Sequence, residues 1–193
     1  IAYARCSKNA RRRGASAGAG SEAIAERHYR QVIAIDPVQP VALNALGMMA
    51  LRVGDDSAVV WFTRATNADP LAPTLWLNLA TAARARQDDE LERAALVHVI
   101  ELDRRDVMAN YRLAELFERT GNTHEAAPYW QGLVMMLGSS TETSVQLDQI
   151  LERARDCASA YASAVGVKLD DALNAGRATF SPIERRRFET CVD

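Results

Sequence analysis

The feature that most constrains the fold is a segment ending that recurs along the chain. The stretches VIAIDP, ATNADP and VIELDR end at Pro37, Pro70 and Arg104, which are 33 and 34 residues apart. A repeat of this length is typical of stacked helical hairpins, in which each unit buries its apolar face only against its neighbours. The spacing therefore predicts an all-α chain.

Turn residues divide each unit into two helices. A glycine lies near the middle of most units because it can adopt the left-handed conformation that ends a helix. These positions are Gly20, Gly54 and Gly121, and in the remaining unit Gln87 takes the place of the glycine. Pro37 and Pro70 separate one hairpin from the next, since proline cannot continue a preceding helix.

The size of the residues follows the same period. Small residues are expected where the two helices of a hairpin approach closely, and large ones where hairpins meet. The small residues are Gly47, Ala80 and Ala114, and the large ones are Phe62, Trp76 and Trp130. We expect Trp76 to be buried between neighbouring units. Glu92 departs from the pattern, because it replaces the small residue expected at its position.

Four regions follow from the pattern. We expect a flexible or degenerate first repeat helix over residues 1–20, about 3.5 repeats over 21–137, a capping helix and linker over 138–178, and a further helix from 179 to 193. Ser181 is a candidate N-cap, followed by Pro182 and, three residues after the cap, Glu184. A helix that starts so clearly and ends at Asp193 predicts that native sequence continues.

Composition excludes several classes of protein. The chain of 193 residues is 48% hydrophobic and 25% charged with a net charge of −2, so no strong field attracts nucleic acid or a membrane. No apolar run is long enough to span a bilayer. Three distant cysteines fit a reducing compartment better than a disulfide framework. We therefore expect a cytoplasmic protein, and the scarcity of lysine beside arginine suggests a bacterial one.

The sequence contains no recognisable catalytic constellation. His28, His98 and His124 fall on different predicted helices, without the H-x-D or H-E-x-x-H spacing of a metal site. The glycine- and alanine-rich residues 14–20 lack the lysine of a phosphate-binding loop and are expected to be a flexible linker. The arginine runs at 11–13 and 185–187 have no interleaved aromatic residues and are expected to be solvated. No catalytic, cofactor-binding or metal-binding residue is predicted.

A ligand of such an array is expected along the concave face formed by the first helix of each hairpin. These positions are Asn44, Met48, Leu51, Asn78, Thr81, Arg84, Tyr111, Arg112, Glu115 and Glu118. The surface is mixed in character, so the partner would be a protein or peptide rather than nucleic acid or membrane. Tyr111 and Arg112 are the expected anchors, because Tyr and Arg dominate interface hot spots. The alternative is a solvated face with a structural role only.

Residues 22–137 resemble tetratricopeptide repeat proteins. More narrowly, the runs AERHYRQVIAIDPVQPVALNALGMMALRVGD, PTLWLNLATAARARQDD and RRRFETCVD resemble the N-terminal region of bacterial aspartyl/asparaginyl β-hydroxylase-like proteins. That resemblance implies a TPR-like superhelix of antiparallel hairpins with C-terminal capping helices, placed before an oxygenase domain that uses iron(II) and 2-oxoglutarate. This chain would then be a non-catalytic interaction scaffold. A structural spacer or oligomerisation domain, or a repeat region of another enzyme such as a sulfotransferase or glycosyltransferase, are the alternatives.

Overall fold

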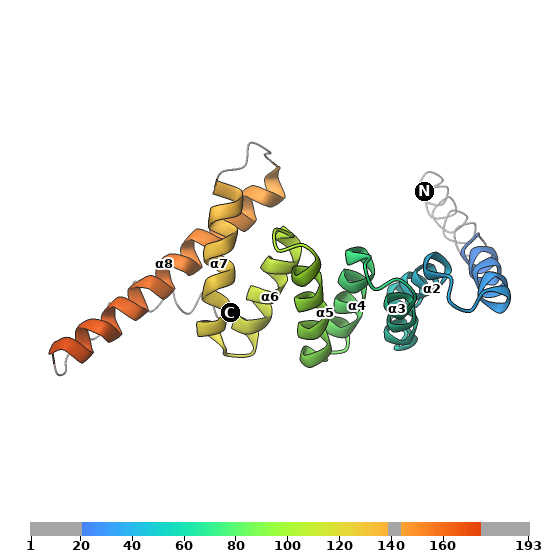
Figure 1. Cartoon of the computed structure of the whole chain (residues 1–193), viewed down its shortest axis with the longest axis horizontal. Helices are drawn as coiled ribbons and strands as arrows, with labels where there is room; N and C mark the ends of the chain where they lie inside the picture. Colours follow the sequence, from blue (N-terminus) through green and yellow to red (C-terminus); the bar gives the residue numbers. More distant parts are fainter. Residues whose placement is uncertain (1–20, 139–143, 175–193) are drawn as a thin grey trace, which may run out of the picture. The chain divides into compact units, whose positions relative to one another are not determined.

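The computed structural model describes residues 21–138 and 144–174, and every regular element in these two ranges is an α-helix (Figure 1). Two compact units divide between Asp88 and Asp89. After a helix over residues 21–35, the first unit contains α2 (Pro40–Arg52), α3 (Ser57–Ala68) and α4 (Pro73–Ala85). The second contains α5 (Asp89–Leu102), α6 (Val107–Arg119), α7 (Thr123–Gly138) and α8 (Val145–Asn174). The all-helical fold class is confirmed.

Local sequence signals explain where the helices begin. Proline occupies the first position of α2 and α4, where its missing N–H costs nothing. The side chain of Gln39 accepts a hydrogen bond from the Ala42 amide at 2.7 Å, and that of Asp106 accepts one from the Ala109 amide at 2.7 Å. Each cap satisfies an amide that has no partner inside its helix, which fixes the start of α2 and of α6.

The predicted turns have the backbone that their sequence requires. Gly54 and Gly121 have φ of 71° and 78°, a region in which most side chains are strained. Gln87, which stands where a glycine was expected, has φ of 59° and is the non-glycine residue with positive φ in the described chain. The position therefore demands the left-handed conformation whichever residue occupies it.

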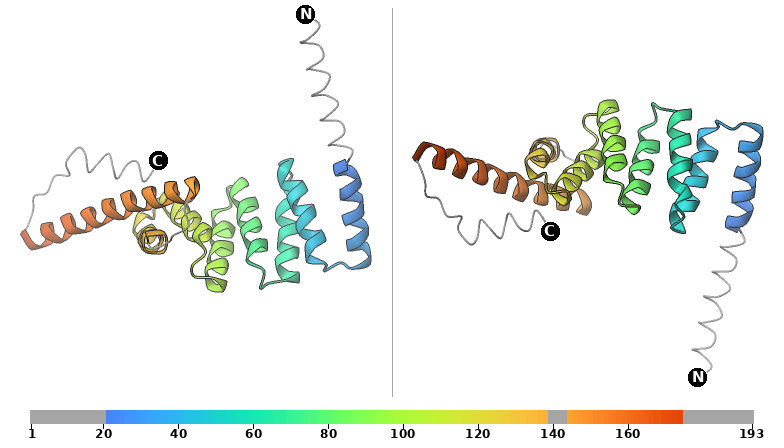
Figure 2. Two further views of the ribbon diagram at one scale, coloured as in Figure 1. Left: turned by 90° about the horizontal axis from the view of Figure 1, so that it is seen from above. Right: turned by 90° about the horizontal axis from the view of Figure 1, so that it is seen from below.

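The first unit is built around Phe62. Its side chain is fully buried, and a Cβ atom added to Gly47 would lie 2.7 Å from the Phe62 ring. Such a contact is too short for any side chain, so the prediction of close approach at Gly47 is confirmed. The helices of this unit lie side by side (Figure 2), with α2 packed on α3 and α3 on α4.

Trp76 is less buried than its place among the large residues predicted. Its side chain is half-buried, and its Nε1 donates a hydrogen bond to the carbonyl oxygen of Pro70 at 2.9 Å. The indole N–H needs an acceptor, and the loop before α4 supplies one at the surface. The expectation of full burial was therefore wrong, whereas the other two large residues, Phe62 and Trp130, are buried at 0% and 1% exposure.

In the second unit α7 packs against both α6 and α8. Trp130, Leu113 and Leu133 are buried in this core, and so is the small Ala114 of α6. α8 is a single helix of 30 residues, which continues into the 138–178 region where a linker was expected after the capping helix. Its described side chains bury a stripe of Ile150, Ala154, Cys157 and Ala164.

Glu92, which departs from the repeat pattern, forms a buried ion pair. Its side chain is 1% exposed, and Arg119 bridges its Oε2 and the Asp89 Oδ1, at 2.7 Å each. A buried carboxylate is tolerated only when it is paired. The Glu92 Oε1 is the one buried side-chain polar atom among the described residues that has no hydrogen-bond partner.

Some predictions lie outside the described residues. They concern residues 1–20, the turn at 139–143, and the segment that includes Ser181 and the arginine run at 185–187. Within the described residues, no helix is both long enough and apolar enough to cross a membrane.

Candidate binding surfaces

The predicted surface of the first unit comes from α2 and α4. Asn78 Nδ2 donates a hydrogen bond to Asn44 Oδ1 at 2.8 Å, which joins two first helices at residues 34 positions apart. Both amides are half-buried, so this bond fixes the spacing between neighbouring repeats. The repeat spacing thus brings these two predicted site residues together.

Four further predicted residues lie on the same two helices, and Leu51 of α2 is half-buried. Met48 is 47% exposed, which makes it an accessible apolar contact point. Thr81 is half-buried and its hydroxyl donates to the carbonyl of Leu77 at 2.8 Å, so the hydroxyl serves its own helix. Arg84 is half-buried in the last turn of α4. The surface of this unit is polar with one exposed thioether.

The predicted residues of the second unit are engaged by α8. The Arg153 guanidinium contacts Glu115 Oε1 at 2.8 Å, the Tyr111 hydroxyl at 3.1 Å and Glu118 Oε2 at 3.2 Å. Tyr111 also donates its hydroxyl proton to Glu115 Oε1 at 2.7 Å. We call these four residues, together with Trp130, the Arg153 network. Arg112, the other expected anchor, is half-buried on α6.

Trp130 links the Arg153 network to the core. Its Nε1 donates to Glu118 Oε1 at 2.8 Å, while its ring packs edge to face against Tyr111 with centroids 5.6 Å apart. The Arg153 guanidinium lies 5.4 Å from the Trp130 ring centroid and 5.7 Å from that of Tyr111. Such cation–π contacts add to the ion pairs. The side chains therefore form one connected unit in which α8 is held to α6 and α7.

Burial and charge act in opposite directions on this network. Burial raises the pKa of the Glu118 carboxyl above its ordinary value, although hydrogen bonds from Cys157 and Trp130 and the charge of Arg153 lower it. Burial also raises the pKa of Tyr111, and its hydrogen bond to Glu115 adds to the effect. For Arg153, burial alone would lower the pKa, but the neighbouring Tyr111 and two carboxylates raise it on balance. Arg153 consequently stays charged.

Sequence reasoning missed Arg153 as a member of this surface. It lies on the helix that was expected only to cap the end of the repeats, between the apolar positions Ile150 and Ala154. A signal was available, because an arginine beside an apolar stripe, opposite a run with Glu115 and Glu118, suggests an ion pair. The partner could not be found without knowing how α8 crosses α6.

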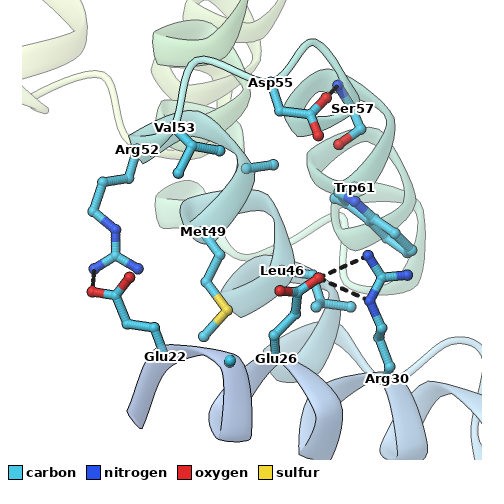
Figure 3. A pocket seen from close by; sticks show the side chains of 12 residues that line it. Glu22, Glu26, Arg30, Leu46, Met49, Arg52, Val53, Asp55, Ser57 and Trp61 are labelled. Carbon is cyan, nitrogen blue, oxygen red and sulfur yellow. Dashed lines mark hydrogen bonds and ion pairs between the residues drawn. The ribbon is translucent and has the colours of Figure 1, made fainter. Parts of the chain in front are cut away.

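A separate hollow of about 330 Å³ opens in the first unit between residues 21–35, α2 and α3 (Figure 3). Met49 and Leu46 line it with apolar surface and Trp61 stands to one side. Two ion pairs frame it: Glu22 with Arg52 at 2.9 Å, and Glu26 with Arg30 at 2.8 Å. Asp55 lines the hollow as well, so its charged side chains are three carboxylates and two guanidinium groups.

The described residues offer no metal site. No group of three or more His, Cys, Asp or Glu side chains in them is arranged to hold a metal ion. His28 belongs to the first unit, whereas His98 and His124 lie on α5 and α7 of the second. The Nδ1 of His98 lies 3.4 Å from Glu101 on its own helix. This side-chain set does not fit the ligands of an iron(II) oxygenase.

These observations define the class of fold: a helical repeat of the tetratricopeptide type. The fold is similar to two solved crystal structures of MamA, each with a TM-score of 0.60 and 19% sequence identity. One match covers 84% of this chain and 90% of MamA, and the other covers 80% and 92%. No protein-family model matches the sequence, and no curated protein matches it.

Proposed function

We propose that this chain is a protein-interaction scaffold whose first helices present a surface to a protein or peptide partner. The observation that carries the proposal is the contact between α2 and α4, in which Asn44 and Asn78 of neighbouring repeats meet at 2.8 Å. First helices joined in this way form a continuous surface, and arrays of this kind bind partners along it. Met48, 47% exposed beside Asn44, supplies an apolar anchor.

The test is a selection for ligands on the intact chain. We expect a random peptide library to yield binders, and the double variant Asn44→Ala/Met48→Ala to lose them while circular dichroism stays helical. A matched control is Val60→Ala, which removes an apolar side chain from α3 that is 57% exposed, against 47% for Met48. Failure to enrich any peptide above an unrelated helical protein would contradict the proposal.

A second candidate, a structural spacer or oligomerisation domain, is favoured by a different observation. Tyr111, Glu115 and Glu118, expected to meet a partner, are satisfied within the chain by Arg153. A surface whose polar groups are already paired gains little from a ligand. If Tyr111→Phe leaves the affinity of a selected peptide unchanged, the second unit acts as a spacer and binding belongs to the first unit.

The narrower proposal places this chain in the N-terminal region of an aspartyl/asparaginyl β-hydroxylase-like protein. It rests on the runs around residues 25–55, 73–89 and 185–193, and attachment to another enzyme such as a sulfotransferase or glycosyltransferase is the alternative. The chain alone should bind no iron(II) in calorimetry, because no group of three or more His, Cys, Asp or Glu side chains in its described residues is arranged to hold a metal ion. A longer protein that includes the natural sequence after Asp193 should bind iron(II) and consume 2-oxoglutarate. A folded longer protein that does neither would contradict the hydroxylase assignment.

A further inference from the structure

A second hollow lies on the second unit, away from the Arg153 network. Its volume is about 440 Å³, and it is lined by residues from the end of α6, the outer side of α7 and α8. Four of its lining residues carry aromatic rings: Phe117, His124, Tyr129 and Tyr161. The hollow of the first unit has one aromatic residue in its lining, Trp61.

The rings form two pairs, one toward each neighbouring helix. Phe117 of α6 stacks with Tyr129 of α7, with centroids 5.7 Å apart and planes at 27°. His124 of α7 meets Tyr161 of α8 edge to face, with centroids 5.7 Å apart and planes at 79°. Each ring is held by its partner, so the lining is pre-organised and little side-chain entropy is lost on binding.

Charge selects the ligand. Among the described residues that line the hollow, Glu125 carries the one formal negative charge, and no lysine or arginine lines it. Burial raises the pKa of Tyr129, and the nearby negative charge of Glu125 adds to this effect. Ring faces are themselves negative and attract cations. The carboxylate of Glu125 would repel an anion, and an apolar group would gain nothing from its charge.

We propose that this hollow binds the arginine or lysine side chain of a protein partner, with the cation against the rings and its charge near Glu125. The proposal deepens the scaffold function above and rests on it. An adjoining hollow of about 300 Å³ shares Tyr129 with the first, and is otherwise lined by Val97, Ile100 and the oppositely charged Glu101 and Arg104. A partner segment with a basic residue followed by an aliphatic residue would therefore occupy both.

The experiment uses the full chain and a fluorescein-labelled peptide of glycine, arginine, valine and glycine, titrated by fluorescence anisotropy. The matched peptide carries citrulline, which has nearly the same shape as arginine but no charge. We expect the citrulline peptide to bind about threefold to tenfold more weakly, the range that cation–π contacts give. Equal binding of the two peptides would overturn the proposal, because the hollow would then select shape alone.

Variants locate the binding. Glu125→Gln and Tyr161→Ala should each weaken the arginine peptide about threefold to tenfold. Glu152→Gln is the control, since it removes one exposed carboxylate from α8 outside the hollow. Glu125→Gln is a conservative change at an exposed position and keeps the test valid if Tyr161→Ala loses helicity. An unchanged affinity in Glu125→Gln would assign the peptide to another surface.

Two further outcomes separate this proposal from binding by the chain's own basic segment and from the scaffold function itself. Binding that appears only after Arg185→Glu/Arg186→Glu/Arg187→Glu would assign the hollow to the chain's own basic segment and overturn the assignment to a partner. Peptides selected on the Asn44 surface should bind Glu125→Gln as they bind the original chain. If these peptides bind the original chain while the arginine peptide does not bind it, the hollow is refuted and the scaffold function stands.

Discussion

Phe62 in the first unit and Trp130 in the second occupy the same place in their hairpins. Each follows a buried alanine by four residues and precedes another buried apolar residue by three. Both side chains are buried, at 0% and 1% exposure, so the two positions perform the same packing task. They differ in one respect: indole carries an N–H group and benzene carries none.

The indole N–H of Trp130 determines which polar residues surround it in the second unit. A buried N–H without an acceptor is costly, and Glu118 Oε1 provides the acceptor at 2.8 Å. The buried carboxylate in turn requires a cation, and Arg153 provides it from α8. Phe62 has no polar group that needs a partner, and its ring occupies the space left by the missing side chain of Gly47. One hairpin is therefore fitted by shape, and the other by a chain of polar contacts that recruits a further helix.

The largest expected loss of stability tests the apolar packing around Phe62. Phe62→Ala should lower the free energy of unfolding by roughly 3–5 kcal/mol, because it opens a cavity that rigid neighbours cannot fill. Trp76→Ala is the control and should cost less, since that indole is half-buried. Urea denaturation followed by circular dichroism measures both. A larger loss for Trp76→Ala would show that the first unit is not built around Phe62.

A smaller loss of stability is expected when Trp130 of the second unit is replaced by phenylalanine, the residue at the matching position of the first. Trp130→Phe keeps most of the apolar volume but removes the donor to Glu118, and should cost roughly 1–3 kcal/mol for a buried acceptor that loses its partner. Trp61→Phe, at a half-buried position of α3, should change stability less. If the two variants unfold at the same urea concentration, the indole N–H is not what organises the second unit.

The smallest effect concerns pH. Burial raises the pKa of Glu118 above its ordinary 4.5, so this carboxyl binds its proton more tightly in the folded chain than in the unfolded one. Its favourable contribution is present below about pH 4.5 and is lost as the pH rises through the raised pKa. The stability of the original chain relative to Glu118→Gln should therefore increase as the pH falls from 7 to 4. The effect of Asn78→Ala, measured in parallel, should not depend on pH.

The fold could be predicted because it depends on spacing. The intervals between Pro37, Pro70 and Arg104, and the glycines at the turns, impose local geometry whatever the neighbours are. Gln87 illustrates the strength of this constraint, since it takes a φ of 59° in a place defined only by the repeat. Local signals of this kind need no knowledge of tertiary contacts.

The candidate surfaces could be predicted only in part. Asn44 and Asn78 follow from the period alone, which places them on neighbouring first helices. The Arg153 network does not, because α8 lies outside the repeat and no period fixes its crossing with α6. The predicted burial of Trp76 was wrong for a related reason. Size suggested burial, whereas the indole N–H was satisfied by a loop carbonyl that the pattern does not reveal.

The length of α8 has a mechanical consequence. A helix rises about 1.5 Å per residue, so the stretch from Ala164, the last buried side chain described on α8, to Asn174 extends roughly 15 Å further. An angular change of about ten degrees at Ala164 would carry the end of α8 roughly 3 Å. Small rearrangements of α7 at the contact between His124 and Tyr161 would therefore be magnified toward the end of α8.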